Sequence, residues 1–238
     1  MVDGHYRPDS DTEQRSDDQD DGEHGRDGTV ESPERLRKLT ARRPTSRSAV
    51  LLVLVVVTGS AYLVLNTPTA GAHVLRTRLD EHIPLVPAFA VPYVVFLPIA
   101  SVVVLLAFLC DRRFDQLALA LITVYTISDA IFAAFPTRVP RPAVSGDDAF
   151  SRLLRYVYAR DKPYAGFPSE HASTATALAV YLVVVTTGRW RGAVVAAAAL
   201  VVASTLLIRQ HFLADALGGV LLGLTAAVVA FRFVREAQ

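Results

Sequence analysis

Long apolar runs separated by short polar segments dominate the chain after residue 48. About 20 mostly apolar residues in a helix cross the roughly 30 Å hydrocarbon core of a membrane. We therefore expect six membrane-spanning helices, at 49–66, 88–110, 116–135, 172–187, 193–209 and 212–233. The fourth and fifth runs are short and also fit a single hairpin, but the arginine-bearing break at 188–192 favours two spans. The pattern predicts an all-α fold, a polytopic membrane helix bundle.

Residues 1–48 have the opposite character, because large apolar residues are nearly absent up to Gly28 and Arg and Lys dominate from Glu34 to Arg47. Such a segment cannot bury enough apolar surface to fold. We predict a disordered, charged cytoplasmic tail over 1–48 and a membrane domain over 49–238. The alternative is a tail that binds a partner.

Composition narrows the class of protein further. The chain is 52% hydrophobic and its net charge is only +1, so nothing in the overall charge favours nucleic acid as a partner. Its single cysteine, Cys110, excludes an intramolecular disulfide and a metal site built from cysteines.

The distribution of arginine predicts an orientation. The basic segments 35–47, 112–113, 189–191 and 232–235 would share one side of the bundle, which the positive-inside rule assigns to the cytoplasm. This places the N-terminus inside, in a multi-pass protein of the cell membrane. The long connection 136–171 on the other side carries six Arg and Lys residues against the rule, and an anionic ligand would explain them.

Counting spans brings the polar motifs together. Two spans separate His171 from His211, and none separates Arg141 from His171. The chain therefore returns to the same face, where Arg141, His171, Arg209 and His211 can meet Asp215.

His211 and Asp215 are four residues apart and share a helix face. An Asp that accepts from one imidazole nitrogen fixes the tautomer and leaves the other nitrogen free to attack. The alternative is a structural pair at a helix end with no chemistry.

Pro168-Ser169-Glu170-His171 has the pattern of a turn that leads into a helix. Ser169 fits an N-cap, a donor to a phosphate oxygen, or both, and His171 is placed to protonate a leaving oxygen. Pro140-Arg141-Pro142 is a rigid segment that presents a guanidinium, a group suited to phosphate, although Arg-Pro pairs also occur in ordinary loops.

The order Arg141-Pro142, Pro168-Ser169-x-His171 and His211-x-x-x-Asp215 resembles the type 2 phosphatidic acid phosphatase (PAP2) superfamily. Three further segments resemble its branch of inositol phosphorylceramide synthases. They are the segment 80–87, Phe135-Pro136-Thr137 and Arg209-Gln210-His211. The resemblance covers roughly 75–225 and implies that 49–238 is a catalytic membrane domain.

The resemblance implies a role for each motif residue. His211 would be the nucleophile that forms a phosphohistidine, Asp215 would orient it, and His171 would be the general acid. Arg141, Ser169 and the backbone near Gly166 or Glu170 would bind phosphate, with no metal and no cofactor.

Departures from the family pattern concern the cations. Ala134 stands where the commoner phosphatases have a lysine, and Ser204-Thr205 stands where they have Ser-Arg. Arg138 and Arg209 are the natural substitutes. Glu170 would repel a phosphate unless it is paired, for example by a loop arginine.

We predict an enzyme that acts at the outer face on a lipid phosphate or a lipid with a phospho-headgroup. Water as the acceptor gives a phosphatase, and an alcohol such as inositol gives a phosphotransferase. A non-catalytic lipid-phosphate binder or transporter is the alternative of another class, although two histidines and Asp215 exceed what binding needs. Asp129, costly to leave unpaired in a span, is expected to brace the loop, with a proton relay as the alternative.

Overall fold

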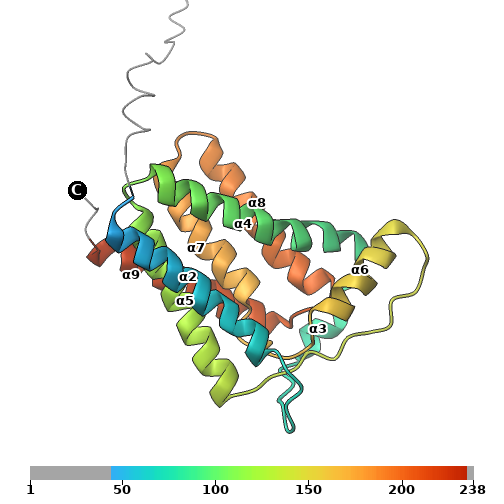
Figure 1. Cartoon of the computed structure of the whole chain (residues 1–238). Helices are drawn as coiled ribbons and strands as arrows, with labels where there is room; N and C mark the ends of the chain where they lie inside the picture. The colour runs from blue at the N-terminus through green and yellow to red at the C-terminus, as the bar shows by residue number, and fades with distance from the viewer. Residues whose placement is uncertain (1–43, 235–238) are drawn as a thin grey trace, which may run out of the picture.

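The computed structural model describes residues 44–234, and the predicted tail at 1–48 lies almost wholly outside them. The described residues are helical, with isolated β-bridges and no strand among them. In chain order the elements are α2 (Ser46–Leu65), α3 (Arg78–His82), η1 (Pro87–Phe89), α4 (Ala90–Cys110), α5 (Phe114–Ala134), α6 (Ala149–Arg160), α7 (Glu170–Val185), α8 (Trp190–Leu207) and α9 (Leu213–Phe233) (Figure 1).

The predicted helical membrane bundle is confirmed. Within residues 44–234, five helical segments are long and apolar enough to cross a membrane: α2, α4 with its leading η1 turn, α5, α8 and α9. The remaining predicted span, at 172–187, corresponds to α7 (Glu170–Val185), whose 16 residues reach only roughly 24 Å. The helix predicted at 193–209 ends at Leu207, so Arg209 and His211 lie in a turn before α9.

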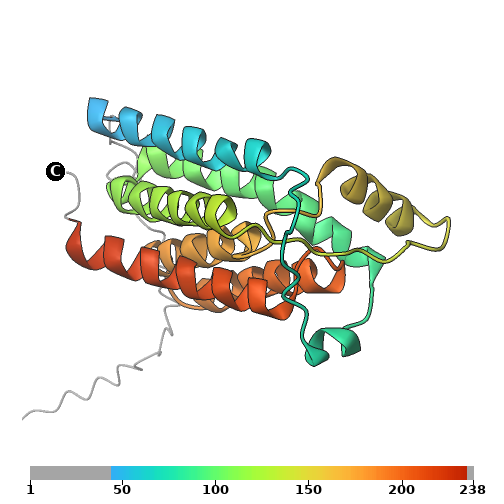
Figure 2. The same cartoon turned by 90° about the horizontal axis from the view of Figure 1, so that it is seen from below.

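Successive long helices run in opposite directions, so alternate connections between them lie at the same end of the bundle. Figure 2 shows α3 and α6 at the same end of the bundle, near the start of α4. The connections 135–148 and 161–169 and the turn 208–212 join elements at this end. His171 and His211, separated by α7 and α8, therefore lie at one end of the bundle.

Helix α7 lies inside the bundle and packs against α5, α8 and α9. Its approach to α9 requires glycine, because a Cβ at Gly219 would lie 2.4 Å from the Ser169 carbonyl oxygen. A Cβ at Gly223 would lie 2.2 Å from the carbonyl oxygen of Ser173. This close packing brings the start of α7 against the first turn of α9, where the Ser169 amide donates to the Asp215 carbonyl at 3.0 Å.

Helices α2 and α4 lie on different neighbours. Helix α2 packs along α5, whereas α4 packs mainly against α8 and α6. Figure 1 shows α7 behind the space between them. This separation leaves room for a cavity between α2 and α4, at the end of the bundle where His171 and His211 lie.

Candidate active site

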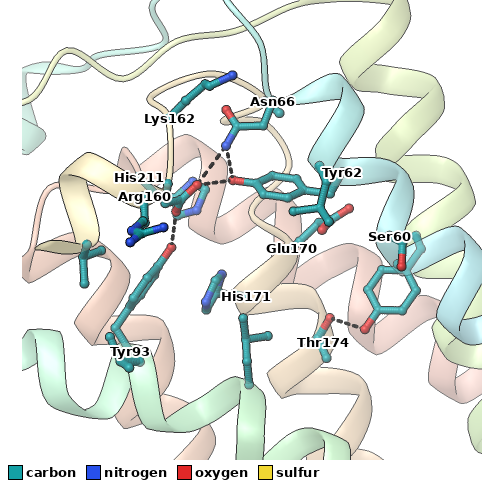
Figure 3. Close-up of a pocket in the computed structure, with 18 of the residues that line it drawn as sticks. Ser60, Tyr62, Asn66, Tyr93, Arg160, Lys162, Glu170, His171, Thr174 and His211 are labelled. Carbon is teal, nitrogen blue, oxygen red and sulfur yellow. Dashed lines mark hydrogen bonds between the residues drawn. The ribbon is translucent and has the colours of Figure 1, made fainter.

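Two cavities meet at His211. The larger one, the histidine cavity, has a volume of about 480 Å³ and is lined by α2, α4, α5, α6 and the start of α7. Its polar lining residues include Ser60, Tyr62, Asn66, Tyr93, Tyr125, Tyr156, Arg160, Asp161, Lys162, Glu170, His171, Thr174 and His211 (Figure 3). The smaller one, the arginine cavity, has a volume of about 340 Å³. It is lined by Val74, Arg76, Val139, Pro140, Arg141, Pro142, Arg209, His211 and Phe212.

His211 is held by a backbone carbonyl. Its Nδ1 lies 3.0 Å from the Gly166 carbonyl oxygen and 3.8 Å from Asp215 Oδ2. Because a carbonyl can only accept, Nδ1 carries the proton and Nε2 keeps the lone pair in the neutral ring. Nε2 has no hydrogen-bond partner among the described residues, and the ring lines both cavities.

Asp215 is brought next to His211 but serves first as a helix cap. Its Oδ2 accepts from the Phe212 amide at 2.8 Å, as expected of an acidic residue in the first turn of α9. Its side chain is 1% exposed and Oδ1 has no hydrogen-bond partner. At 3.8 Å the carboxylate acts on the imidazole through its charge, while Gly166 supplies the orienting hydrogen bond.

The turn before α7 is ordered by internal hydrogen bonds. The amides of Gly166 and Phe167 both donate to Thr137 Oγ1, at 2.9 and 2.8 Å. Ser169 is fully buried and its Oγ accepts from the Ala172 amide at 3.4 Å, so its predicted role as an N-cap is confirmed. Ser169 and Gly166 line neither cavity, and these groups shape the wall behind His211.

His171 is positioned by aromatic packing. Its ring stacks on Tyr93 with centroids 4.1 Å apart and planes 12° apart, and Phe96 lies at 5.9 Å. Its Nε2 is buried and has no hydrogen-bond partner. The ring lines the histidine cavity, as His211 does (Figure 3).

Arg141 lies in the arginine cavity with most of its donors already used. Its guanidinium donates to the carbonyls of Tyr158, at 3.3 Å, of Lys162, at 3.0 Å, and of Asp161. The group also lies over the Tyr158 ring, 4.9 Å from its centroid. Burial lowers the pKa of Arg141, although the Asp161 charge opposes this effect. Nε is the buried donor that remains without a partner.

Arg209 also donates to backbone carbonyls through its guanidinium. Its backbone has φ +55°, and its guanidinium donates to the carbonyls of Asp80, at 2.6 Å, and Ile83. Asp80 in turn accepts from the Leu213 amide at 2.7 Å and from the Thr77 amide at 2.7 Å. The segment that begins at Asp80 therefore accepts hydrogen bonds from Arg209 and Leu213, one on each side of His211.

Comparison with protein families decides the identity of this arrangement. A family model described as the PAP2 superfamily matches residues 116–238, more than half of the chain. The chain belongs to the PAP2 superfamily. A comparison with curated proteins and another with solved structures found no match. PAP2 membership supports a phosphatase or phosphotransferase type of function in general.

The structure also shows what stands at the departures from the PAP2 pattern. Ala134 is exposed at the end of α5, while Ser204 and Thr205 are buried and bond to carbonyls of their own helix, α8. Arg138 is exposed and lines neither cavity. Of the two substitutes predicted for the PAP2 cations, only Arg209 lies in a cavity, and two of its three guanidinium nitrogens already donate to carbonyls.

Two residues of this PAP2 site escaped the sequence interpretation. Arg76 lines the arginine cavity, with one ion pair, to Glu81, at 3.8 Å. Asp161 follows α6 and lies at the centre of a hydrogen-bond network. Its carboxylate accepts from Tyr62 at 2.7 Å, Asn66 at 2.8 Å, Tyr93 at 2.7 Å and Gln210 at 3.2 Å.

The Asp161 network joins elements that are far apart in the chain. Tyr62 and Asn66 belong to the end of α2, Tyr93 to α4 and Gln210 to the turn beside His211. A charged residue at the end of a helix is common, so no motif marks Asp161 in the sequence.

Over residues 44–234 no group of three His, Cys, Asp or Glu side chains is arranged to hold a metal ion.

Proposed function

We propose that this PAP2 protein is a membrane lipid-phosphate phosphatase or phosphotransferase that works through a phosphohistidine on His211. One observation carries the proposal. The bond from Nδ1 to the Gly166 carbonyl leaves the Nε2 lone pair of His211 free, and the ring lies between a cavity with arginines and a cavity with a second histidine.

In the first step, His211 Nε2 attacks the phosphorus and the bond from phosphorus to the leaving oxygen breaks. His171, in its protonated form, gives its proton to the leaving oxygen. Asp215, 3.8 Å from Nδ1, stabilises the positive charge that the attacking ring acquires. In the second step, an acceptor oxygen attacks the phosphorus and gives its proton to His171, and the bond from nitrogen to phosphorus breaks.

Arg141 and Arg209 would bind the phosphate through their Nε–H groups, which have no hydrogen-bond partner. Charge-assisted hydrogen bonds of this kind are strong ligands for phosphate. Arg138, Ser169 and Gly166, the other expected phosphate ligands, would need to rearrange when substrate binds. Arg76 is a further candidate because it lines the arginine cavity.

The acceptor is water or an alcohol such as inositol. The segments that resemble the inositol phosphorylceramide synthases support the His211 turn and the Gly166 backbone, through Asp80 and Thr137. A phosphatase needs that support as much as a transferase does, so these contacts favour neither acceptor. A non-catalytic lipid-phosphate binder remains the alternative of another class.

The proposed orientation is an N-terminus in the cytoplasm and an active site at the outer face of the cell membrane. Arg112, Arg113 and Arg189 lie in the connections at the end opposite the two cavities, and Arg191 lies in the first turn of α8 at the same end. The positive-inside rule assigns that end to the cytoplasm.

The test is turnover of a lipid phosphate, labelled in its phosphate group, by purified protein in detergent with a metal chelator. His211→Ala should lower the rate by about a thousandfold or more, because the nucleophile is lost. His82→Ala is the matched control, since His82 is exposed and contacts the carbonyl of Arg78 in its own helix.

Labelled phosphate should also be trapped on the wild-type protein and not on His211→Ala. Wild-type turnover by His211→Ala would refute the phosphohistidine. Tight binding of the lipid phosphate without turnover would favour the binder. Release of free phosphate against transfer to an added polyol separates the two acceptors.

A further inference from the structure

Glu170 is a carboxylate without a partner inside the histidine cavity. It is the first residue of α7, precedes His171 and lines the cavity with it (Figure 3). Its Oε1 is buried and has no hydrogen-bond partner. The arginine expected to pair with it is not there: Arg141 is bonded to backbone carbonyls, and no ion pair to Glu170 is formed within residues 44–234.

The charges that act on Glu170 are also negative. Asp129 of α5 and Asp161 are the charged groups that influence its carboxylate most. Asp129 Oδ1 is itself buried without a hydrogen-bond partner, whereas Asp161 is satisfied by its four donors. Arg160 and Lys162 line the cavity too, but both are exposed, and the Arg160 guanidinium lies over the Tyr156 ring.

A buried carboxylate with no cation costs several kcal/mol unless a positive group or a proton neutralises it. A second carboxylate behind it raises that cost and increases the attraction for a cation. A hydroxyl ligand could satisfy a lone pair of Glu170, but it would leave the negative charge of Glu170 and Asp129 uncompensated. An ammonium group does both.

We propose that Glu170, with Asp129 behind it, binds a positively charged amino group on the substrate. This inference rests on the proposed function, in which His211 receives the phosphate of the same molecule. The two ends of the histidine cavity then match the two charges of one ligand, a lipid that carries both a phosphate and an amino group. Leu63, Val94 and Leu97 supply an apolar wall for its chain.

The test compares three synthetic lipids that differ at one position: hexadecyl phosphate, 2-aminohexadecyl phosphate and 2-hydroxyhexadecyl phosphate. Wild-type protein should prefer the amino lipid, and Glu170→Gln should lower kcat/KM for it by about tenfold or more. The ratio of kcat/KM for the amino lipid to kcat/KM for hexadecyl phosphate should fall by a similar factor in Glu170→Gln, because only the amino lipid loses an ion pair. Asp147→Asn is the control, because Asp147 is fully exposed on the loop before α6.

An equal loss on all three lipids would overturn the inference and leave the phosphohistidine intact. A loss as large on the hydroxyl lipid as on the amino lipid would also overturn it. Should Glu170→Gln fold poorly, Asp129→Asn must reduce the preference for the amino lipid, because Asp129 lies outside the cavity lining.

Failure of the proposed function gives a different result, namely no turnover of any of the three lipids. Binding then decides the inference. The amino lipid should raise the thermal unfolding midpoint of the wild-type protein in detergent more than hexadecyl phosphate does, and Glu170→Gln should abolish the difference. Equal midpoint shifts for the two lipids in wild type would refute it.

Discussion

The two cavities beside His211 differ in what their charged groups are free to do. In the arginine cavity, Arg141 and Arg209 donate to backbone carbonyls and keep only Nε without a partner. In the histidine cavity, Asp161 is saturated, while Glu170 and His171 each keep a buried polar atom without a partner. The number of charges in a site is therefore a poor guide to its binding capacity. The unsatisfied atoms show where a ligand would be held.

Removal of the Asp161 side chain should have the largest effect, and most of it should fall on the histidine cavity, where Tyr62, Asn66 and Tyr93 lie. In Asp161→Ala, Tyr62, Asn66 and Tyr93 lose their common acceptor, and we expect a loss of about 3 kcal/mol or more in stability. Activity should also fall, since Tyr93 carries the stacked His171 ring. Arg141 bonds to the backbone carbonyl of residue 161 and should stay in place.

Thermal unfolding in detergent and kcat measure these two effects. Asp147→Ala provides the baseline, because Asp147 is a fully exposed carboxylate in the connection before α6. Wild-type stability and kcat in Asp161→Ala would mean that the network does not organise the histidine cavity.

A methyl group at Gly223 should weaken the packing of α7 on α9. Its Cβ would meet the Ser173 carbonyl oxygen at 2.2 Å, so α7 and α9 must separate, at about 1–3 kcal/mol. Gly192→Ala is the matched control in α8, because nothing lies within 4 Å of its Cβ, and it should be neutral or slightly stabilising. Equal unfolding midpoints for the two variants would contradict the close packing of α7 on α9.

Arg76→Ala should identify the cavity that receives the phosphate. If the arginine cavity holds it, loss of this half-exposed guanidinium should raise KM about tenfold and leave kcat nearly unchanged. Added salt should reduce the difference from wild type. Arg78→Ala, an exposed arginine of α3 outside both cavities, should leave KM unchanged. An unchanged KM in Arg76→Ala would assign the phosphate to the histidine cavity.

The smallest effect is expected from the carboxylate that supports the His211 turn. Burial opposes the charge of Asp80, but hydrogen bonds from Thr77 and Leu213 outweigh it, so the pKa of Asp80 is lowered from its ordinary value of 3.8. A lowered folded-state pKa adds stability above the ordinary value, and this stability is lost as pH falls through the lowered one. The advantage of wild type over Asp80→Asn, about 1 kcal/mol, should therefore vanish in acid. Unfolding measured over a pH series tests this, and an advantage that persists in acid would contradict it.

Much of the fold could be predicted from the sequence, because membrane spans are a local property. The apolar runs placed the helices to within a few residues, and the count of two spans between His171 and His211 predicted that both lie at one end. The N-cap role of Ser169 is also local, since it depends on the turn that precedes α7.

The hydrogen bond that orients His211 could not be read from the spacing. Asp215 lies one helical turn from His211, but as the third residue of α9 it bonds to the Phe212 amide, and the Gly166 carbonyl 45 residues earlier takes Nδ1. Asp161 and Arg76 were missed for the same reason. Their neighbours, such as Tyr62 for Asp161, come from segments far away in the chain, and no periodicity encodes which loop crosses which helix.

The clamp between Arg209 and the segment at Asp80 has a consequence for how the chain can be divided. The PAP2 match begins at residue 116, yet Asp80 and Ile83 receive the Arg209 donors, and Asp80 caps the first amide of α9. A polypeptide that began at residue 116 would keep His171, His211 and Asp215 and lose the contacts that hold the His211 turn in place. The half that matches the PAP2 family model is therefore not a module that could be transplanted alone, because residues of the first half hold its candidate site in place.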